Sequence, residues 1–213
     1  GEGHAGCPKL YKAQYIDKIV PQPISYPLSF GIMMHDALYL LEKEDLTPEE
    51  ALQKAWDPKL TQKDFAEALD DLRNVIERGG VLPNLHTINV EQRIKKLLYV
   101  DEEYGEIYYQ GILDWIGIGE QEDVLYFADY KTDRAPWSQA DAQNWVQGKS
   151  YAWLLQESEY LEKELPGVTN PIIVGLVELT KFYTLQVTYT EEEIEAWRSW
   201  AEATARKILR EKD

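Results

Sequence analysis

Gly111-Ile-Leu-Asp114, followed fifteen residues later by Asp129-Tyr-Lys131, is the part of the sequence that decides the fold. Both motifs lie in apolar runs typical of strands, and as neighbouring strands they would place two carboxylates and one ammonium at the same sheet edge. Carboxylate oxygens hold hard divalent cations, and a lysine beside an attacking water suits metal-dependent phosphodiester hydrolysis. A buried Asp–Lys ion pair that holds a hairpin is the alternative. This segment alone does not distinguish the two.

Two helical features favour the metal-site interpretation over the buried ion pair, but only in combination with these strands. Gln147 and Tyr151 are four residues apart in a helix expected at 139–156, so they share one face. The same pattern also fits an ordinary amphipathic helix. His35 lies on another apolar helix, where a lone histidine is more often a core residue than a metal ligand.

The order of these motifs along the chain resembles that of a known family. His35, Gly111-x-x-Asp114, Asp129-Tyr-Lys131 and Gln147-x-x-x-Tyr151 occur in the order found in the PD-(D/E)xK nuclease superfamily. Within it, the chain is most similar to the RecB-like exonucleases, which include the CRISPR-associated adaptation exonucleases. Glu91 stands where these proteins often carry a glutamate shortly before the first metal aspartate. The resemblance covers nearly the whole chain.

The resemblance implies a fold and a role for each motif residue. The fold would be α/β, with a restriction-endonuclease-like mixed central β-sheet flanked by helices. His35, Asp114, Asp129 and the Tyr130 carbonyl would ligate the metal. Lys131 would position the attacking water or stabilise the charge that develops on the phosphate. The remaining implied site residues are Gln147 and Tyr151, which would contact the DNA backbone and orient Lys131, and Glu91, which would hold a nearby water or Arg93.

The chemistry of the ligands predicts the metal. Two carboxylates and a carbonyl oxygen suit Mg²⁺, which retains several waters. One imidazole favours Mn²⁺. We therefore expect Mg²⁺ or Mn²⁺, with higher activity in Mn²⁺.

The cysteine content separates this chain from some of its relatives. Those relatives hold an iron–sulfur cluster with four cysteines, whereas Cys7 is the only cysteine here. No such cluster can therefore form within one chain. A single cysteine also excludes a disulfide framework and is typical of a reducing, cytoplasmic setting.

Length and composition predict one soluble domain. The chain has 213 residues, of which 44% are hydrophobic, and no apolar run approaches the roughly 18 residues of a membrane span. We expect a single nuclease domain over 1–213, with 41–80 as a peripheral acidic helical insertion. Those forty residues hold eleven acidic and six basic side chains.

The net charge of −16 is unusual for a nuclease, because proteins that hold DNA tightly neutralise several phosphates. We therefore expect weak, salt-sensitive binding to DNA ends. Arg134 and Lys149 are candidate phosphate contacts near the site. Among the aromatic residues, Trp115 and Trp153 are expected in the core, and Trp137 is the candidate that would stack on a base.

The pattern of apolar residues predicts an order of elements. A capping box at Thr47-Pro-Glu-Glu50 should open a helix that ends near Trp56, and Thr190-Glu-Glu-Glu193 should cap the final helix, which ends near Arg210. The other expected helices are 5–18, 28–43, 62–78 and 139–156. The expected strands are 86–92, 94–100, 105–116, 123–131, 171–178 and 182–189.

Together with the resemblance, these observations predict a divalent-metal-dependent DNA exonuclease that acts on single strands or DNA ends. Repair, phage recombination and CRISPR adaptation all stay open as its pathway. An end- or flap-directed endonuclease is the closest alternative. A non-catalytic DNA-binding scaffold of a helicase–nuclease assembly is another. An acidic protein that acts through a protein partner or as a homo-oligomer also stays open.

Overall fold

The computed structural model describes residues 26–77, 82, 84–119, 124–132, 137–156, 158–166, 172–179 and 183–210. The expected first helix at 5–18, with Cys7, lies outside these residues. None of the described helices combines the length and the apolar composition needed to cross a bilayer.

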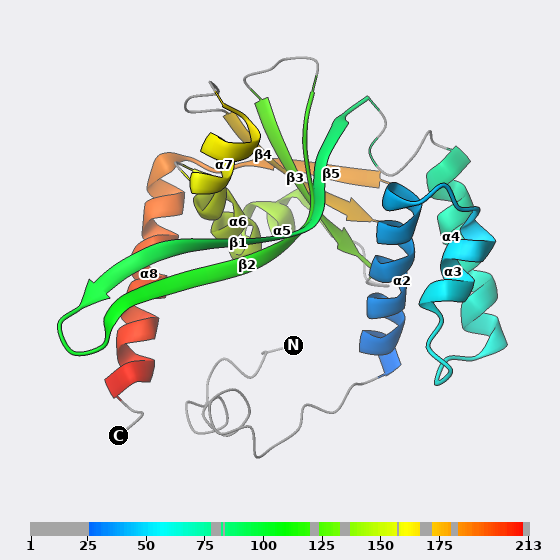
Figure 1. Ribbon diagram of the computed structural model, residues 1–213, viewed down its shortest axis with the longest axis horizontal. Helices are drawn as coiled ribbons and strands as arrows, with labels where there is room; N and C mark the ends of the chain where they lie inside the picture. Colours follow the sequence, from blue (N-terminus) through cyan, green and yellow to red (C-terminus); the bar gives the residue numbers. More distant parts are fainter. Residues whose placement is uncertain are drawn as a thin grey trace.

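A mixed five-stranded sheet forms the centre of the protein (Figure 1). Its strands occur in the order β1-β2-β3-β4-β5, in which β3 and β4 are parallel and the other neighbours are antiparallel. This arrangement confirms the expected α/β class with a mixed sheet. The strands are β1 (His86–Asp101), β2 (Gly105–Ile118), β3 (Val124–Lys131), β4 (Ile172–Leu179) and β5 (Tyr183–Thr188).

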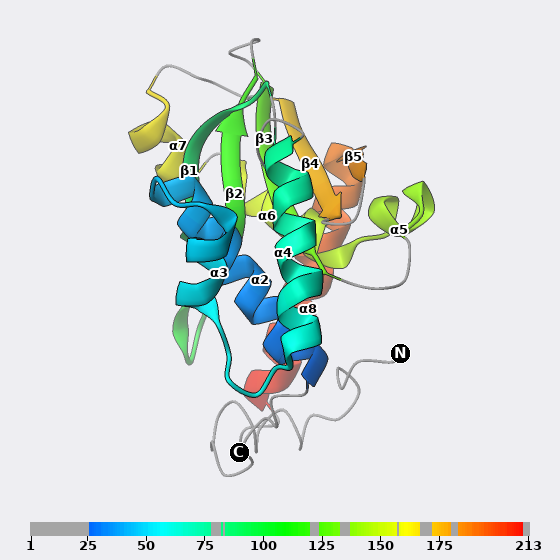
Figure 2. The same ribbon diagram turned by 90° about the vertical axis from the view of Figure 1, so that its right-hand side faces the viewer.

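Helices cover both faces of this sheet, so the described residues form two hydrophobic cores (Figure 2). One core packs α2, α3 and α4 against the sheet and contains Trp115. The other packs α5, α6, α7 and α8 against the opposite face and contains Trp153. Both tryptophans are therefore core residues, as expected. The helices are α2 (Tyr26–Lys43), α3 (Pro48–Ala55), α4 (Gln62–Glu77), α5 (Gln139–Gln143), α6 (Val146–Leu155), α7 (Glu159–Glu164) and α8 (Glu191–Arg210).

Both predicted capping boxes are present. The Thr47 hydroxyl accepts the Glu50 N–H at 3.3 Å, and the Glu50 carboxylate accepts the Thr47 N–H at 2.9 Å. Thr190 and Glu193 repeat this pair of bonds at the start of α8, at 3.2 and 3.0 Å. Each box satisfies amide groups that the first helical turn leaves without partners.

The structure differs from the predicted elements in three places. The strands expected at 86–92 and 94–100 are the single strand β1, because β2 pairs with it along its whole length. The helix expected at 139–156 is divided into α5 and α6, because Trp145 has an extended backbone and its side chain is buried in the core. Helix α7 was not expected; Ser158 caps it and Leu161 anchors it in the core.

The paired strands β1 and β2 continue well beyond the rest of the sheet. Strand β3 pairs with β2 only between Trp115 and Ile118, whereas β1 and β2 pair as far as their turn at Asp101 and Gly105. The part of this hairpin at 92–113 is called the arm below. Its inner face packs on α6 and α8, and Figure 1 shows it projecting across α8.

Candidate functional site

The two aspartates of the strand motifs lie side by side. Asp114 on β2 and Asp129 on β3 each lie one position beyond the last backbone pair of these strands, Trp115 with Ala128. Both side chains are buried, and only 7% of Asp114 and 2% of Asp129 is exposed. Burial and the negative charge of Asp114 raise the pKa of Asp129 to about 6, although Lys131 opposes the shift. The two buried carboxylates therefore repel each other.

His35 reaches this pair of carboxylates from helix α2. Its Nδ1 lies 3.4 Å from Asp114 Oδ2, and its Nε2 lies 2.8 Å from the Tyr130 carbonyl oxygen. Burial lowers the pKa of His35, but the hydrogen bond and charge of Asp114 outweigh it, and the pKa rises to about 8. A Cβ on Gly31, one turn earlier, would lie 3.2 Å from Thr132 Oγ1, so glycine lets α2 approach the end of β3 closely.

Glu91 joins the same cluster from strand β1. His35, Glu91 and Asp114 each offer a ligand atom, and these atoms lie within 4.8 Å of one another. Burial and the charge of Asp114 raise the pKa of Glu91. The structure records no ion pair between Glu91 and Arg93, one of the two roles expected for this glutamate, among the residues that it describes.

The backbone bends where Glu91 and Asp114 lie. Glu91 has a φ of 50°, in the left-handed region that costs a non-glycine residue free energy. Leu113 belongs to the core under α6, whereas Trp115, two residues later, belongs to the core under α2. Regular alternation would place both on one face. The bend therefore lies at the two acidic residues.

Lys131 is held by a short series of polar contacts from β3 to helix α6. Its ammonium forms an ion pair with Asp129 and donates to Gln147 Oε1 at 3.2 Å. Gln147 Nε2 donates to the Tyr151 hydroxyl at 2.6 Å, and that hydroxyl donates to the Ile112 carbonyl at 2.7 Å. This order of donors fixes the amide of Gln147 with its oxygen toward Lys131. Tyr151 is 5% exposed, so it reaches the site only through Gln147.

Gly111 allows Tyr151 to cross the strand at this point. A Cβ on Gly111 would lie 3.1 Å from Tyr151 Cε1 and 2.9 Å from Leu154 Cδ1, which is too close for either to stay in place. Close packing thus explains why glycine occupies the first position of the Gly111-x-x-Asp114 motif. It lets the tyrosine that orients Gln147 pack directly on β2.

The candidate DNA contacts have different surroundings. Trp137 is half-buried against Trp145, and its ring centroid lies 5.7 Å from the Lys131 ammonium. Lys149 forms an ion pair with Glu193 at 3.5 Å, which partly neutralises its charge. Arg134 lies outside the described residues.

These residues surround an open cleft with a volume of about 660 Å³. Its acidic and basic groups lie at the sheet edge, and exposed apolar side chains of α2 and the arm lie beside them. The described residues that line it are Pro27, Leu28, Gly31, Ile32, His35, Asp36, Glu91, Ile112, Asp114, Asp129, Tyr130, Lys131, Thr132 and Gln147.

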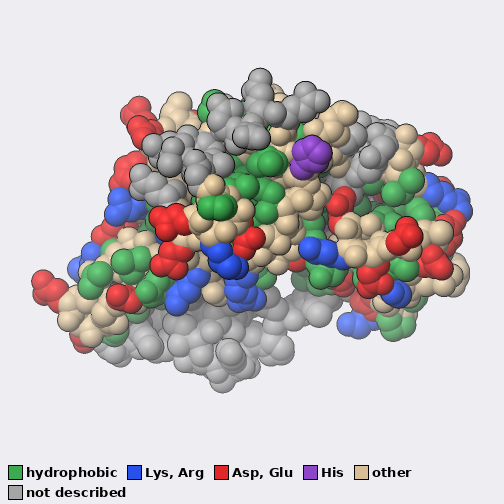
Figure 3. All heavy atoms as spheres, turned by 45° about the horizontal axis from the view of Figure 1, so that its top comes forward, with side chains coloured by type: hydrophobic (Ala, Val, Ile, Leu, Met, Phe, Trp, Pro, Cys, Tyr) green, Lys and Arg blue, Asp and Glu red, His purple; other side chains and the backbone are tan. Residues whose placement is uncertain are grey.

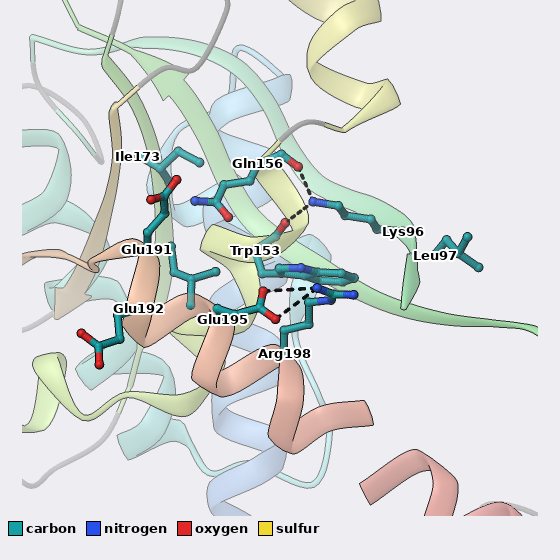
Figure 4. Close-up of a pocket in the computed structure, with 10 residues that line it drawn as sticks. Lys96, Leu97, Trp153, Gln156, Ile173, Glu191, Glu192, Glu195 and Arg198 are labelled. Carbon is teal, nitrogen blue, oxygen red and sulfur yellow. Dashed lines mark hydrogen bonds and ion pairs between the residues drawn. The ribbon is translucent and has the colours of Figure 1, made fainter. Parts of the chain in front are cut away.

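A larger hollow, of about 810 Å³, lies between the arm, α6 and the start of α8 (Figure 4). The Lys96 ammonium there donates to the Trp153 and Gln156 carbonyls, and Arg198 pairs with Glu195 at 3.1 Å. Its cationic groups thus already bind the protein itself. None of the motif residues lines it, so the smaller cleft is the candidate site.

The donor atoms in the cleft fit a hard divalent cation. They are carboxylate oxygens, one backbone carbonyl oxygen and one imidazole, the set that Mg²⁺ and Mn²⁺ accept in proteins. The raised pKa of Asp129 fits the same conclusion, since a cation would offset the repulsion between the two aspartates. Glu91 lies close enough to add a further oxygen.

Positive charge is not gathered into a broad patch on the face in Figure 3. There, the described Lys and Arg side chains are interspersed with Asp and Glu. A large basic surface for a DNA duplex is thus missing from the described part of this face.

Comparison with known proteins places this geometry in a family. The model of the PD-(D/E)XK nuclease superfamily matches residues 2–213. A crystal structure of a "Putative exonuclease" from Eubacterium rectale is similar, with a TM-score of 0.56 and 13% identity over 95% of this chain and 73% of the other. The crystal structure of SSO0001 has a TM-score of 0.41 and 14% identity over 93% and 84%. No curated protein matches the sequence.

Proposed function

The chain belongs to the PD-(D/E)XK nuclease superfamily, with its restriction-endonuclease-like α/β fold, and we propose that it is a divalent-metal-dependent DNA exonuclease. It hydrolyses phosphodiester bonds of single strands or DNA ends. The convergence of His35, Asp114 and Asp129 around one cleft, with Lys131 in contact with Asp129, is the observation that supports this proposal most.

His35, Asp114, Asp129 and the Tyr130 carbonyl would hold Mg²⁺ or Mn²⁺, and Glu91 lies within reach of the same position. When bound, the ion supplies Lewis-acid chemistry and a water of lowered pKa. The neutral imidazole of His35 would favour Mn²⁺, so we expect higher activity in Mn²⁺ than in Mg²⁺.

Lys131 positions the attacking water or stabilises the charge that develops on the phosphate. Both roles need an ammonium in a fixed place, and the Gln147 oxygen and the Asp129 carboxylate hold it there. Gln147 is also able to contact the DNA backbone, because it lines the cleft. Tyr151 acts as a positioning residue behind it. Trp137, Lys149 and Arg134 are proposed DNA contacts of lesser weight.

The preference for single strands or ends is supported by charge. The sequence carries a net charge of −16, so an extended duplex would meet strong repulsion with few cations to offset it. The similar structure from Eubacterium rectale carries the description "Putative exonuclease", and we propose action at ends for this chain as well. We expect binding to be weak and cleavage to decrease as salt rises.

The whole chain is proposed to act as one nuclease domain, with 41–80 as its peripheral acidic helical part. Leu52 of α3 and Leu72 of α4 are fully buried in the core shared with α2, which supports packing on the nuclease body. A protein partner or a second copy that bound these acidic helices would change where the nuclease is recruited, but not the hydrolysis in the cleft.

Cleavage of DNA oligonucleotides labelled at the 5′ or the 3′ end tests the proposal. Single and double strands are incubated with Mn²⁺, Mg²⁺ or EDTA, and product ladders are resolved on gels. We expect stepwise shortening of single strands in metal and no cleavage in EDTA. Lys131→Ala should lose cleavage, whereas Lys43→Ala, an exposed lysine at the end of α2, should keep it.

Two results would point to the alternative functions. A single internal cut near a junction would identify an end- or flap-directed endonuclease. DNA binding without cleavage in any metal, unchanged by Lys131→Ala, would identify a non-catalytic scaffold and contradict the proposed hydrolysis.

A further inference from the structure

The outer face of the arm has a regular pattern of exposed side chains. Along β2, Tyr108, Gln110 and Ile112 are exposed, while the residues between them face α6 and α8. Along β1, the exposed residues of this face alternate in the same way and pair across the hairpin with those of β2. They are Arg93 opposite Ile112, Lys95 opposite Gln110 and Leu97 opposite Tyr108.

The two cations of this face are available to an external anion. Neither Arg93 nor Lys95 forms an ion pair with any residue that the structure describes. Lys95 instead lies over the ring of Tyr108, with 3.8 Å between its ammonium and the ring centroid. The Tyr108 hydroxyl donates to Glu106 at 2.6 Å, which fixes the ring beneath the ammonium. In so acidic a chain, two cations on one strand face that have no acidic partner in the described part of the structure indicate a surface that can bind an anion.

The apolar side chains of the same face are unusually exposed. Leu97, Tyr108 and Ile112 are 42%, 42% and 41% exposed, although large apolar residues are normally buried. Cationic side chains beside an exposed aromatic ring are a combination that binds single-stranded nucleic acid, because phosphates meet the cations and bases stack on aromatic rings. Tyr108 supplies the ring here, and Leu97 and Ile112 extend the apolar surface on either side of it.

The face is continuous with the candidate active site. Ile112 lines the cleft, and Asp114 lies two residues further along the same strand, with a Glu91 ligand atom within 4.8 Å of one of its own. The distance from Asp114 to Tyr108 along the strand is roughly 20 Å, at about 3.3 Å per residue. A single-stranded nucleic acid whose end lies at Asp114 would therefore run along Arg93 and Lys95.

We infer that the outer face of the arm is a track for single-stranded nucleic acid that leads the strand into the cleft. This inference rests on the proposed nuclease function and adds the surface that selects single strands. The arm is two strands wide, so its backbones are only about 5 Å apart. A face this narrow, with two cations, can contact a single nucleic-acid strand along its length. It provides too few contacts to bind a duplex.

The acidic tip of the arm limits the track. Glu102 and Glu103 are exposed in the turn, and Glu106 lies beside Tyr108. These carboxylates repel phosphates, so the strand should leave the arm near Leu97 and Tyr108. Affinity should therefore rise with oligonucleotide length only until the strand spans Ile112 to Tyr108.

The double variant Arg93→Gln/Lys95→Gln tests the track. Its matched control is Lys43→Gln/Lys163→Gln, which removes two exposed lysines of α2 and α7 outside the arm. Fluorescence anisotropy of a labelled oligothymidylate in EDTA measures binding without turnover. Hydrolysis of bis(p-nitrophenyl) phosphate in Mn²⁺ measures the cleft, because this small diester is too short to extend from the cleft along the arm.

We expect the arm variant to bind the oligonucleotide at least about tenfold more weakly, with a log–log salt slope lower by about 1.4 for two lost phosphate contacts. The small diester should be hydrolysed at the wild-type rate, and the control should match the wild type in both assays. Size-exclusion chromatography and thermal unfolding confirm that the variants keep their assembly and fold.

Equal oligonucleotide affinity in the arm variant and its control would overturn the track. A changed oligomeric state with unchanged affinity would overturn it too, and would identify the face as a contact between copies. If the wild type hydrolysed neither substrate but bound the oligonucleotide in an arm-dependent way, the proposed catalysis would fail while the track would stand.

Discussion

Replacing Tyr151 with phenylalanine removes one oxygen atom from the contacts that hold Lys131. The hydroxyl accepts the Gln147 amide N–H at 2.6 Å and donates to the Ile112 carbonyl at 2.7 Å. Without it, the Gln147 side chain can rotate, and either its oxygen or its nitrogen can then face the Lys131 ammonium. The ring itself stays, so the packing against Gly111 is retained.

The loss of the Tyr151 hydroxyl should lower both the free energy of unfolding and kcat. The loss of two partly buried hydrogen bonds should lower the free energy of unfolding by about 1–3 kcal/mol, at about 1 kcal/mol each with some cost for groups left unsatisfied. A displacement of Lys131 by about 1 Å should lower kcat by roughly 100-fold, because catalysis depends steeply on such placement. KM should change little, since Tyr151 is buried behind Gln147.

Steady-state cleavage of a labelled single strand in Mn²⁺ and urea unfolding measure these effects. Tyr39→Phe is the matched control, because Tyr39 is an exposed tyrosine of α2. If Tyr151→Phe kept wild-type kcat while it lost stability as expected, the hydroxyl would not act through Lys131. The positioning role of Gln147 would then have to be abandoned.

Two further variants test the site in other ways. Gly111→Ala should cut kcat at least tenfold, because its Cβ would lie 3.1 Å from the Tyr151 ring; a fully active, stable variant in cleavage and thermal-unfolding assays would contradict this steric account. The apparent Mn²⁺ affinity of the wild type should rise about tenfold per pH unit up to about pH 8, because bound metal needs neutral His35 and the pKa of His35 is raised to about 8. In the metal-free protein, the free energy of unfolding changes with pH in the opposite direction. The stability that protonated His35 contributes is fully present below about pH 6.5 and is lost as the pH rises through about 8. Calorimetric titrations and urea unfolding across this range measure both effects, and His35→Gln should flatten them; an affinity independent of pH in the wild type would count against His35 as a ligand.

The sequence predicted the elements and contacts that depend on local spacing. Asp114 and Asp129 were expected at one sheet edge because their motifs were interpreted as neighbouring strands, and strands β2 and β3 bring them together. Gln147 and Tyr151 were expected on one helical face, and they are hydrogen-bonded to each other. The two capping boxes could also be predicted from local spacing, because their hydrogen bonds join residues three positions apart.

The features that the sequence did not predict depend on distant packing. The break between α5 and α6 exists because burial of Trp145 outweighs helix propensity there. The positive φ of Glu91 and the bend at Asp114 arise where the hairpin passes from one core to the other. No local pattern marks that point. The proximity of Glu91 to His35 follows from the bend and could not be read from spacing.

His35, Asp114 and Asp129 are proposed to form one divalent-cation site, and Lys131 acts beside this site without binding the ion. Mn²⁺ binding, followed by isothermal calorimetry and by the electron paramagnetic resonance of free Mn²⁺, tests it in the wild type, Asp114→Asn and Lys131→Ala. We expect Asp114→Asn to lose the tightly bound ion, and Lys131→Ala to keep the ion but fail to cleave DNA. Unchanged Mn²⁺ affinity in Asp114→Asn, or wild-type cleavage by Lys131→Ala, would contradict it.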